Sequence, residues 1–336
     1  MEKKTFRFST SPVDYYFGGG FSKLKEVVDP KKTVLITDEN IYGHYTTKFK
    51  NWDTIVLKPG EQYKVQATVD ALVDQLIEMG ADRSTTLVGV GGGVITDLTG
   101  YVASVYMRGI AFGFVPTTLL ALVDASIGGK NGIDVGVYKN MVGAIRQPAF
   151  ILHDLAFLNT LPEIEWKSGF AEIIKHASIK DAAMFKTLED NTLSSYQKKK
   201  KQTCELIQRN ALIKTKVVQQ DEFEKGDRKM LNFGHTLGHA LENQYELTHG
   251  EAISIGMAYA ASLSQTITGF KQTDRVVSLL DKYHLPTFAE FNKDKVIEVL
   301  SKDKKKIKDN IQFILLERIG KAVIKPVTIK QIYQTL

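Results

Sequence analysis

The first half of the chain alternates short runs of β-branched residues with amphipathic helical sequence. Five runs are typical of buried strands and occupy residues 32–37, 53–58, 85–91, 110–117 and 149–154. The helical segment 65–79 ends at Gly80, and its apolar stripe consists of Val69, Leu72, Val73, Leu76 and Ile77. This strand–helix–strand order predicts an α/β domain with a parallel sheet and right-handed crossovers.

The second half has a different, mostly helical pattern. Helices are expected over residues 164–179, 184–194, 204–218, 233–247 and 252–268, and a late hairpin over 311–317 and 321–327. A chain of 336 residues has material for about two domains. We therefore expect an α/β domain over residues 1–155 and a helical domain over 156–336.

Composition excludes several classes of protein. Hydrophobic residues at 43% and charged residues at 24% are typical of a globular chain, and the one cysteine, Cys204, rules out a disulfide framework. The N-terminus lacks a signal-type apolar stretch, and the longest apolar run, 109–123, is too short to span a bilayer. The net charge of +6 is not arranged as a stripe with aromatics. We therefore expect a cytoplasmic enzyme with a small anionic substrate, bound to neither nucleic acid nor membrane.

Three of the seven histidines lie close together, at His235, His239 and His249. Imidazole is a common zinc ligand, and a catalytic zinc takes three protein ligands plus one open position. Spacing leaves the ligand set open, because Glu172 with two histidines and the helical trio of His235, His239 and Glu242 fit equally well. The alternative is that these are ordinary surface or core histidines.

A glycine-rich turn follows the third predicted strand, from Gly89 to Gly93. Glycines there let a helix N-terminus approach a pyrophosphate. The spacing departs from the usual dinucleotide fingerprint, because Val94 replaces the third glycine and the candidate ribose acid, Asp38, ends an earlier strand. Asp38, Glu61, Gly92 and Thr117 would share the carboxyl edge of the sheet, which favours a variant dinucleotide site over a mere tight turn.

A second polar region spans residues 123–140. Lys130 follows two glycines, and Lys139 comes nine residues later. Lysine binds phosphate as a point charge and glycine lets a loop wrap closely around a ligand, so we expect a phosphate-binding loop. The alternative is a flexible surface loop that carries lysines.

Long motifs carry a resemblance to a known family. GGGVITDLTGYVASVYMRG, VPTTLLALVDASIGGKNGID, SGFAEIIKHA, RKMLNFGHTLGHALE and HGEAISIGM resemble the 3-dehydroquinate synthases, a branch of the sugar-phosphate cyclases that shares its fold with glycerol dehydrogenase. The resemblance spans nearly the whole chain and is densest from Val88 to Met257. It implies a Rossmann-like NAD-binding α/β domain followed by an all-α domain that binds metal and substrate.

The resemblance also implies roles for individual residues. A zinc or cobalt ion is held by Glu172, His235 and His249. Catalytic positions are His239, Lys175, Lys130, Asn232 and Arg228. Substrate binders are these five with Asp124, Lys139, Asn140, Lys214, Arg108 and a late lysine, Lys304 or its neighbour Lys305. NAD-binding positions are Asp38, Asn40, Glu61, Lys64, Gly92, Gly93, Asp97, Thr117, Thr118, Asp124, Lys139, Thr160 and Leu161. Arg108 would reach into the site of a neighbouring subunit, which implies a homodimer.

The implied activity is that of a phosphorus–oxygen lyase of the shikimate pathway and aromatic amino-acid biosynthesis. It converts 3-deoxy-D-arabino-heptulosonate 7-phosphate to 3-dehydroquinate and phosphate by NAD-recycled oxidation, elimination, reduction, ring opening and aldol closure. The rivals are another sugar-phosphate cyclase, such as an inosose synthase, a metal-dependent polyol dehydrogenase of the same fold, and a non-catalytic binding protein. Modest departures from the family pattern include Arg146 and the short stretch between His239 and His249.

Overall fold

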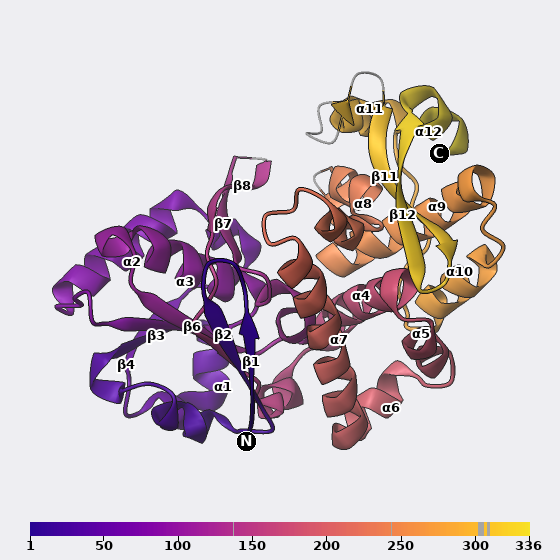
Figure 1. The fold of residues 1–336 in the computed structure, drawn as a ribbon. Coiled ribbons are helices and arrows are strands. Elements are labelled where there is room, and N and C mark those ends of the chain that lie inside the picture. Colours follow the sequence, from indigo (N-terminus) through magenta and orange to yellow (C-terminus); the bar gives the residue numbers. More distant parts are fainter. Residues whose placement is uncertain (137, 243, 302–305, 308–309) are drawn as a thin grey trace. The chain divides into compact units, whose positions relative to one another are not determined.

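The computed structural model describes residues 1–136, 138–242, 244–301, 306–307 and 310–336 (Figure 1). The chain forms two compact units. The first consists of Met1–Glu165 and Cys204–Phe223, and the second of Trp166–Thr203 and Glu224–Leu336. The chain therefore crosses between units three times, where the sequence analysis expected one boundary after residue 155. In the described residues, no helix is long and apolar enough to cross a membrane.

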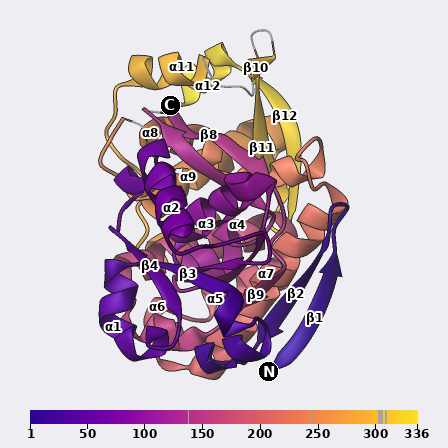
Figure 2. The ribbon, with the colours of Figure 1, turned by 90° about the vertical axis from the view of Figure 1, so that its left-hand side faces the viewer.

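The first unit is built on a seven-stranded sheet with the order β1-β2-β9-β6-β5-β3-β4. Its strands are β1 (Glu2–Arg7), β2 (Pro12–Phe17), β3 (Thr33–Asp38), β4 (Asp53–Leu57), β5 (Thr86–Gly91), β6 (Ala111–Pro116) and β9 (Phe150–Leu152). All neighbours pair in parallel except β1 with β2. The five predicted strands and the parallel sheet are confirmed. The β1–β2 hairpin escaped prediction because β1, an edge strand rich in lysine, has no apolar run; it is the indigo ribbon of Figure 2.

Both faces of the central strands β3, β5 and β6 are buried, as is typical of a parallel sheet. Alternate residues of β3 enter different cores: Val34 and Ile36 belong to one cluster and Leu35 to the other. The helices of this unit are α1 (Glu39–Phe49), α2 (Gln66–Glu78), α3 (Gly93–Val105) and most of α7 (Lys200–Gln220). Helix α7 belongs here because Ala211 joins the first cluster and Thr215 Oγ1 donates a hydrogen bond to the Tyr15 hydroxyl at 3.0 Å.

The expected phosphate-binding loop is largely a β-hairpin of β7 (Lys130–Val135) and β8 (Tyr138–Ile145). Its glycines serve the pairing, since a Cβ on Gly143 would lie 2.2 Å from the carbonyl oxygen of Asn131. Against α3, Gly100 leaves room for the Asn131 side chain, which donates to the carbonyls of Gly129 and Arg146. Glycines interrupt the two-residue alternation that is typical of strands, so this segment was predicted as a loop and not as a hairpin.

The second unit is mainly helical. It contains most of α4 (Glu163–Lys180) and all of α5 (Ala182–Glu189), α6 (Leu193–Lys198), α8 (His235–Glu242), α9 (His249–Thr268), α10 (Thr273–Lys282), α11 (Lys293–Ser301) and α12 (Ile329–Thr335). The single helix expected over 184–194 is two helices, because Thr192 starts α6 with a capping box. Strands β10 (Lys306–Ile307), β11 (Asn310–Arg318) and β12 (Lys321–Thr328) form a small antiparallel sheet, which confirms the late hairpin. Its core joins α8 and α9 to β11 through side chains that include Leu237, Leu263 and Phe313.

Candidate functional site

In the second unit, close packing of helices positions His235 and His249, which begin α8 and α9. A Cβ on Gly256 of α9 would lie 1.9 Å from the carbonyl oxygen of Gly234, at the turn into α8. A Cβ on Gly250, beside His249, would lie 2.4 Å from the Cα of Ser168 on α4. Only glycine permits these approaches, and they bring the first turns of α8 and α9 near α4.

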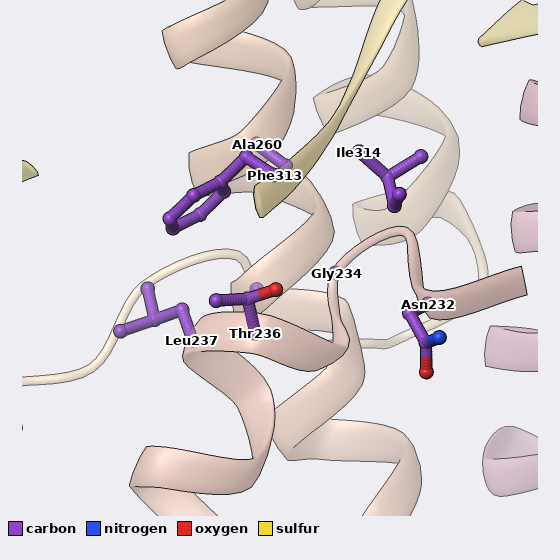
Figure 3. A pocket seen from close by; sticks show the side chains of 8 residues that line it. Asn232, Gly234, Thr236, Leu237, Ala260, Phe313 and Ile314 are labelled. Carbon is purple, nitrogen blue, oxygen red and sulfur yellow. The ribbon is translucent and has the colours of Figure 1, made fainter. Parts of the chain in front are cut away.

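The turn at Gly234 also borders a small crevice, shown in Figure 3 with Thr236, Leu237, Phe313 and Ile314 around it. The crevice has no room for a water molecule. It is a packing seam between α8, α9 and β11 and not a place for substrate.

The three helices bring together Glu172 of α4, His235 of α8 and His249 of α9. Glu172 Oε1 lies 3.1 Å from His249 Nε2 and 3.5 Å from His235 Nε2, and one ligand atom from each residue lies within 4.8 Å of the others. Two imidazole nitrogens and one carboxylate oxygen are the donor set of a catalytic zinc site. Glu172 is fully buried, and its other oxygen pairs with Lys175. The rival trio of His235, His239 and Glu242 is not among the groups that gather within ligand reach in the described chain.

Protonation states suit a metal ligand at His235. Burial, followed by the charge of Lys175, holds the pKa of His235 well below its usual value, so the ring is neutral. Its Nδ1 lies 3.2 Å from the Phe233 carbonyl and can donate there, which leaves the Nε2 lone pair facing Glu172. Burial lowers the pKa of His249, but its contacts with Glu172 and Glu242 outweigh this and raise it to about 9. A metal ion would therefore displace a proton from His249.

Other expected catalytic residues lie in the same unit. His239 is one turn after His235 on α8, with ring centroids 5.1 Å apart, and is exposed. Asn232 donates to Glu224 Oε1 at 2.8 Å, and Arg228 is buried in the 3-10 turn Asp227–Asn232 that precedes α8. Lys304 and Lys305 lie outside the described residues.

In the first unit, three of the expected dinucleotide residues, Asp38, Gly92 and Thr117, lie at the carboxyl edge of the sheet. The chain order reverses between β3 and β5, which is where α/β sheets bind ligands. Asp38 ends β3, Gly92 follows β5, and Thr117 follows β6 with its backbone N–H bonded to the Gly91 carbonyl at 3.0 Å. Gly89 and Gly91 have a packing role instead, because a Cβ on either would collide with Thr99 or Ile95 of α3.

Two of these acids also have structural partners. Asp38 caps α1 by accepting the Ile41 N–H at 2.9 Å. Asp97 pairs at 2.6 Å with Lys64, which also contacts Asn140 at 2.7 Å and Glu61 at 3.7 Å. Burial acts to lower the pKa of Lys64, but Asp97 and Glu61 outweigh it and raise the pKa, so Lys64 is a fixed positive charge at this edge.

The remaining predicted positions are spread over the first unit. Lys214 of α7 binds both the carboxylate of Asp124, at 2.9 Å, and its carbonyl, at 2.8 Å. Thr160 lies 3.0 Å from the hydroxyl of Tyr45 on α1, with Leu161 next in the chain. The others occupy the start of α1, the start of α3, the loop after β6, the β7–β8 hairpin and the turn after α3: Asn40, Gly93, Thr118, Lys130, Lys139 and Arg108. Arg108 is exposed and, like Met107 before it, has a positive φ.

Two features of the candidate metal cluster were not predicted from the sequence. Glu242 appeared only as a rival ligand, whereas its Oε2 lies 3.7 Å from His249 Nδ1. The glycines Gly250 and Gly256 were not recognised as packing residues. The available signal was the short spacing of small residues at the start of α9.

Comparison with solved structures defines the class of protein. The chain matches a 2-deoxy-scyllo-inosose synthase complexed with carbaglucose-6-phosphate, NAD+ and Co2+ at 28% identity, with 99% of each chain covered and a TM-score of 0.88. It matches a 2-epi-5-epi-valiolone synthase from Streptomyces hygroscopicus subsp. jinggangensis 5008, with NAD+ and Zn2+ bound, at 26% identity over 100% of this chain and 97% of that one, with a TM-score of 0.87. Glycerol dehydrogenase from Schizosaccharomyces pombe shares the fold, at a TM-score of 0.63. The predicted fold class is confirmed as that of the sugar-phosphate cyclases and these dehydrogenases.

Family profiles narrow the class. Residues 54–168 match the N-terminal and residues 169–306 the C-terminal 3-dehydroquinate synthase family. A 3-dehydroquinate synthase from Campylobacter curvus (strain 525.92) is 39% identical over 331 residues, which cover 95% of this chain and 94% of that protein. The chain therefore belongs to the 3-dehydroquinate synthase family.

Proposed function

We propose that this chain converts 3-deoxy-D-arabino-heptulosonate 7-phosphate to 3-dehydroquinate and phosphate. The observation that carries the proposal is the cluster of buried Glu172 and His235 with partly exposed His249, in which the ammonium of Lys175 pairs with the carboxylate. The family membership supports it directly. A substrate with both phosphate and carboxylate also accounts for the basic side chains Lys175, Lys214 and Arg228 that the fold buries.

The proposal includes two bound groups, NAD and a zinc or cobalt ion. Related structures contain NAD+ with Co2+ or Zn2+. The donor set of Glu172, His235 and His249 fits either metal. The carboxyl edge formed by Asp38, Gly92 and Thr117, with the other NAD positions of the resemblance, fits a dinucleotide. When bound, NAD supplies reversible hydride acceptance and the metal polarises a substrate hydroxyl.

The chain's own residues would position the substrate and move protons. Lysine and arginine side chains hold anionic ends, and fixing both ends converts successive steps into unimolecular ones. We assign this role to Lys130, Lys139, Lys214 and Arg228, with the amides of Asn140 and Asn232 as further donors, whereas the Asp124 carboxylate would accept hydrogen bonds from substrate hydroxyls. His239 is exposed one turn after His235, and we assign its imidazole to proton exchange with a substrate hydroxyl. Lys175 holds the charge of Glu172 in a fully buried position.

We also propose a cytoplasmic homodimer in which Arg108 completes the neighbouring subunit's site. Arg108 is exposed and held at a φ of 65°, a conformation that costs free energy for a non-glycine residue and often marks a functional position. Mixing an Arg108→Ala variant with a Lys130→Ala variant should restore part of the activity. No recovery in mixed dimers would contradict a shared site.

One assay tests the activity and its rivals. With NAD, zinc and the heptulosonate phosphate, the protein should release inorganic phosphate without net NADH. Steady accumulation of NADH would instead support a polyol dehydrogenase. Phosphate release only from a sugar phosphate that lacks a carboxylate would support another sugar-phosphate cyclase. The absence of any product would support a non-catalytic binding protein.

A second assay tests the ligand set. His249→Ala should lose bound metal, whereas His239→Ala should keep the metal and lose turnover. The metal content of both purified variants distinguishes ligand from proton carrier. An equal loss of metal in both would show that the assignment is wrong.

A further inference from the structure

Helix α8 presents a second functional group at its far end. His235 is its first residue and Glu242 its last, and a separation of seven residues puts both on the same face, two turns apart. The Glu242 side chain is 7% exposed, and its Oε2 lies 3.7 Å from Nδ1 of His249. One helix face therefore carries both His235 and a carboxylate directed at His249.

The two nitrogens of His249 face different carboxylates. Nε2 lies 3.1 Å from Glu172 Oε1, on the side of the donor cluster, and Nδ1 faces Glu242. A histidine that binds a metal through one nitrogen is held in its tautomer and orientation by a partner at the other nitrogen. For His235 that partner is the carbonyl of Phe233.

His249 has greater need of such a partner. Its side chain is 31% exposed, against 11% for His235, and it is the first residue of α9. The other nearby acid, Glu251, is engaged elsewhere, since its Oε2 accepts the backbone N–H and the hydroxyl of Thr248 in the capping box. Among the contacts of the described residues, Glu242 is thus the carboxylate that faces Nδ1.

We propose that Glu242 is a positioning residue that orients His249 through Nδ1 and thereby raises the affinity of the cluster for its metal ion. The inference rests on the proposed function, because it takes Glu172, His235 and His249 as the ligands. The 3.7 Å between Glu242 Oε2 and His249 Nδ1 is an ion-pair distance rather than that of a short hydrogen bond. The negative charge of Glu242 therefore contributes to metal affinity, in addition to the orientation that the carboxylate gives the His249 ring.

The test measures zinc affinity of metal-free protein by competition with a chromophoric chelator. Glu242→Ala, which removes both charge and acceptor, should weaken zinc binding about 10- to 100-fold. Glu242→Gln keeps an acceptor oxygen at similar size and should lose less. The matched control is Glu246→Gln, which removes the same charge from an exposed position four residues away and should bind zinc as the wild type does.

Two further readouts separate positioning from a structural role. In the cobalt-loaded protein, Glu242→Gln should shift the visible absorption bands, because the geometry at His249 changes. The unfolding temperature of the metal-free Glu242→Gln protein should match that of the control. Unchanged zinc affinity in both Glu242 variants, or a loss of metal-free stability with unchanged affinity and spectrum, would overturn the proposal. Failure of the wild type itself to bind zinc would instead overturn the ligand set of the proposed function.

Discussion

The two candidate sites of this chain are built in different ways. In the first unit, Asp38, Gly92 and Thr117 each stand at or just after the end of a strand, and parallel pairing places them on one edge. In the second unit, Glu172, His235 and His249 come from three helices, and 77 residues separate the first from the last. The positions in the first site are fixed by where the parallel strands end. The positions in the second depend on how closely α4, α8 and α9 approach one another.

This difference affects what each site tolerates. At the edge of the sheet, Asp38 is partly exposed and also caps α1, whereas Thr117 is buried. In the cluster of Glu172, His235 and His249, the first two residues are buried, and contacts between glycines and backbone atoms set the positions of the helices that carry all three. We therefore expect single substitutions to impair one site and spare the other. The largest effects should fall on the cluster of Glu172, His235 and His249.

The largest effect is expected for Gly256→Ala. Its Cβ would lie 1.9 Å from the Gly234 carbonyl oxygen, so α8 and α9 must move apart. Overpacking of this kind costs about 3 kcal/mol. Urea unfolding should show the loss, and metal content should fall because the histidines separate. NAD binding should survive, and an equal loss of both ligands would contradict the independence of the two sites.

A buried histidine should make the first unit sensitive to acid. His153 is fully buried against Phe17, and burial lowers its pKa to about 4 despite its bond to the Leu122 carbonyl. The unfolded state therefore binds more protons between pH 6.5 and 4, so stability falls as the pH falls through this window. From pH 7 to pH 5, the free energy of unfolding of the His153→Phe variant should fall by about 2 kcal/mol less than that of the wild type. Unfolding curves at both pH values measure this, and an unaltered pH profile would exclude His153 as the cause.

Asp38→Asn should separate the two roles of this residue. Asparagine caps a helix about as well as aspartate, so α1 and the unfolding temperature should be unchanged. The loss of a charged acceptor should weaken NAD binding about tenfold. Titration calorimetry with NAD provides the measurement. If affinity is unchanged, Asp38 is only a cap.

The smallest effect is expected for Gly43→Ala in α1. Apart from its chain neighbours and the backbone of its own helix, nothing lies within 4 Å of a Cβ at this position, in contrast to Gly256. Alanine in a helix interior should stabilise the protein by about 0.5–1 kcal/mol. Urea unfolding should show the gain with both ligands still bound. A destabilisation would show that the space around a glycine does not decide how its replacement by alanine changes the stability of this protein.

The sequence predicted the first unit well because its signals are local. Each strand of the parallel sheet is a continuous apolar run, and the carboxyl edge follows from strand ends. The β7–β8 hairpin and α7's place in the first unit were not predicted. They depend on contacts such as Asn131 against Gly100 and Thr215 against Tyr15, between residues distant in the chain.

The sequence by itself determined the α/β sheet, the glycine turn at its edge and the presence of a histidine cluster that resembles a family's metal site. Spacing could not say which acid meets the histidines, because His235, His239 and Glu242 share one helical face just as a metal site would require. The tertiary structure decided that Glu172 lies between His235 and His249, while Glu242 faces the outer nitrogen of His249. The physical reason is the close approach of α4, α8 and α9, which depends on glycines whose neighbours lie far away in the sequence.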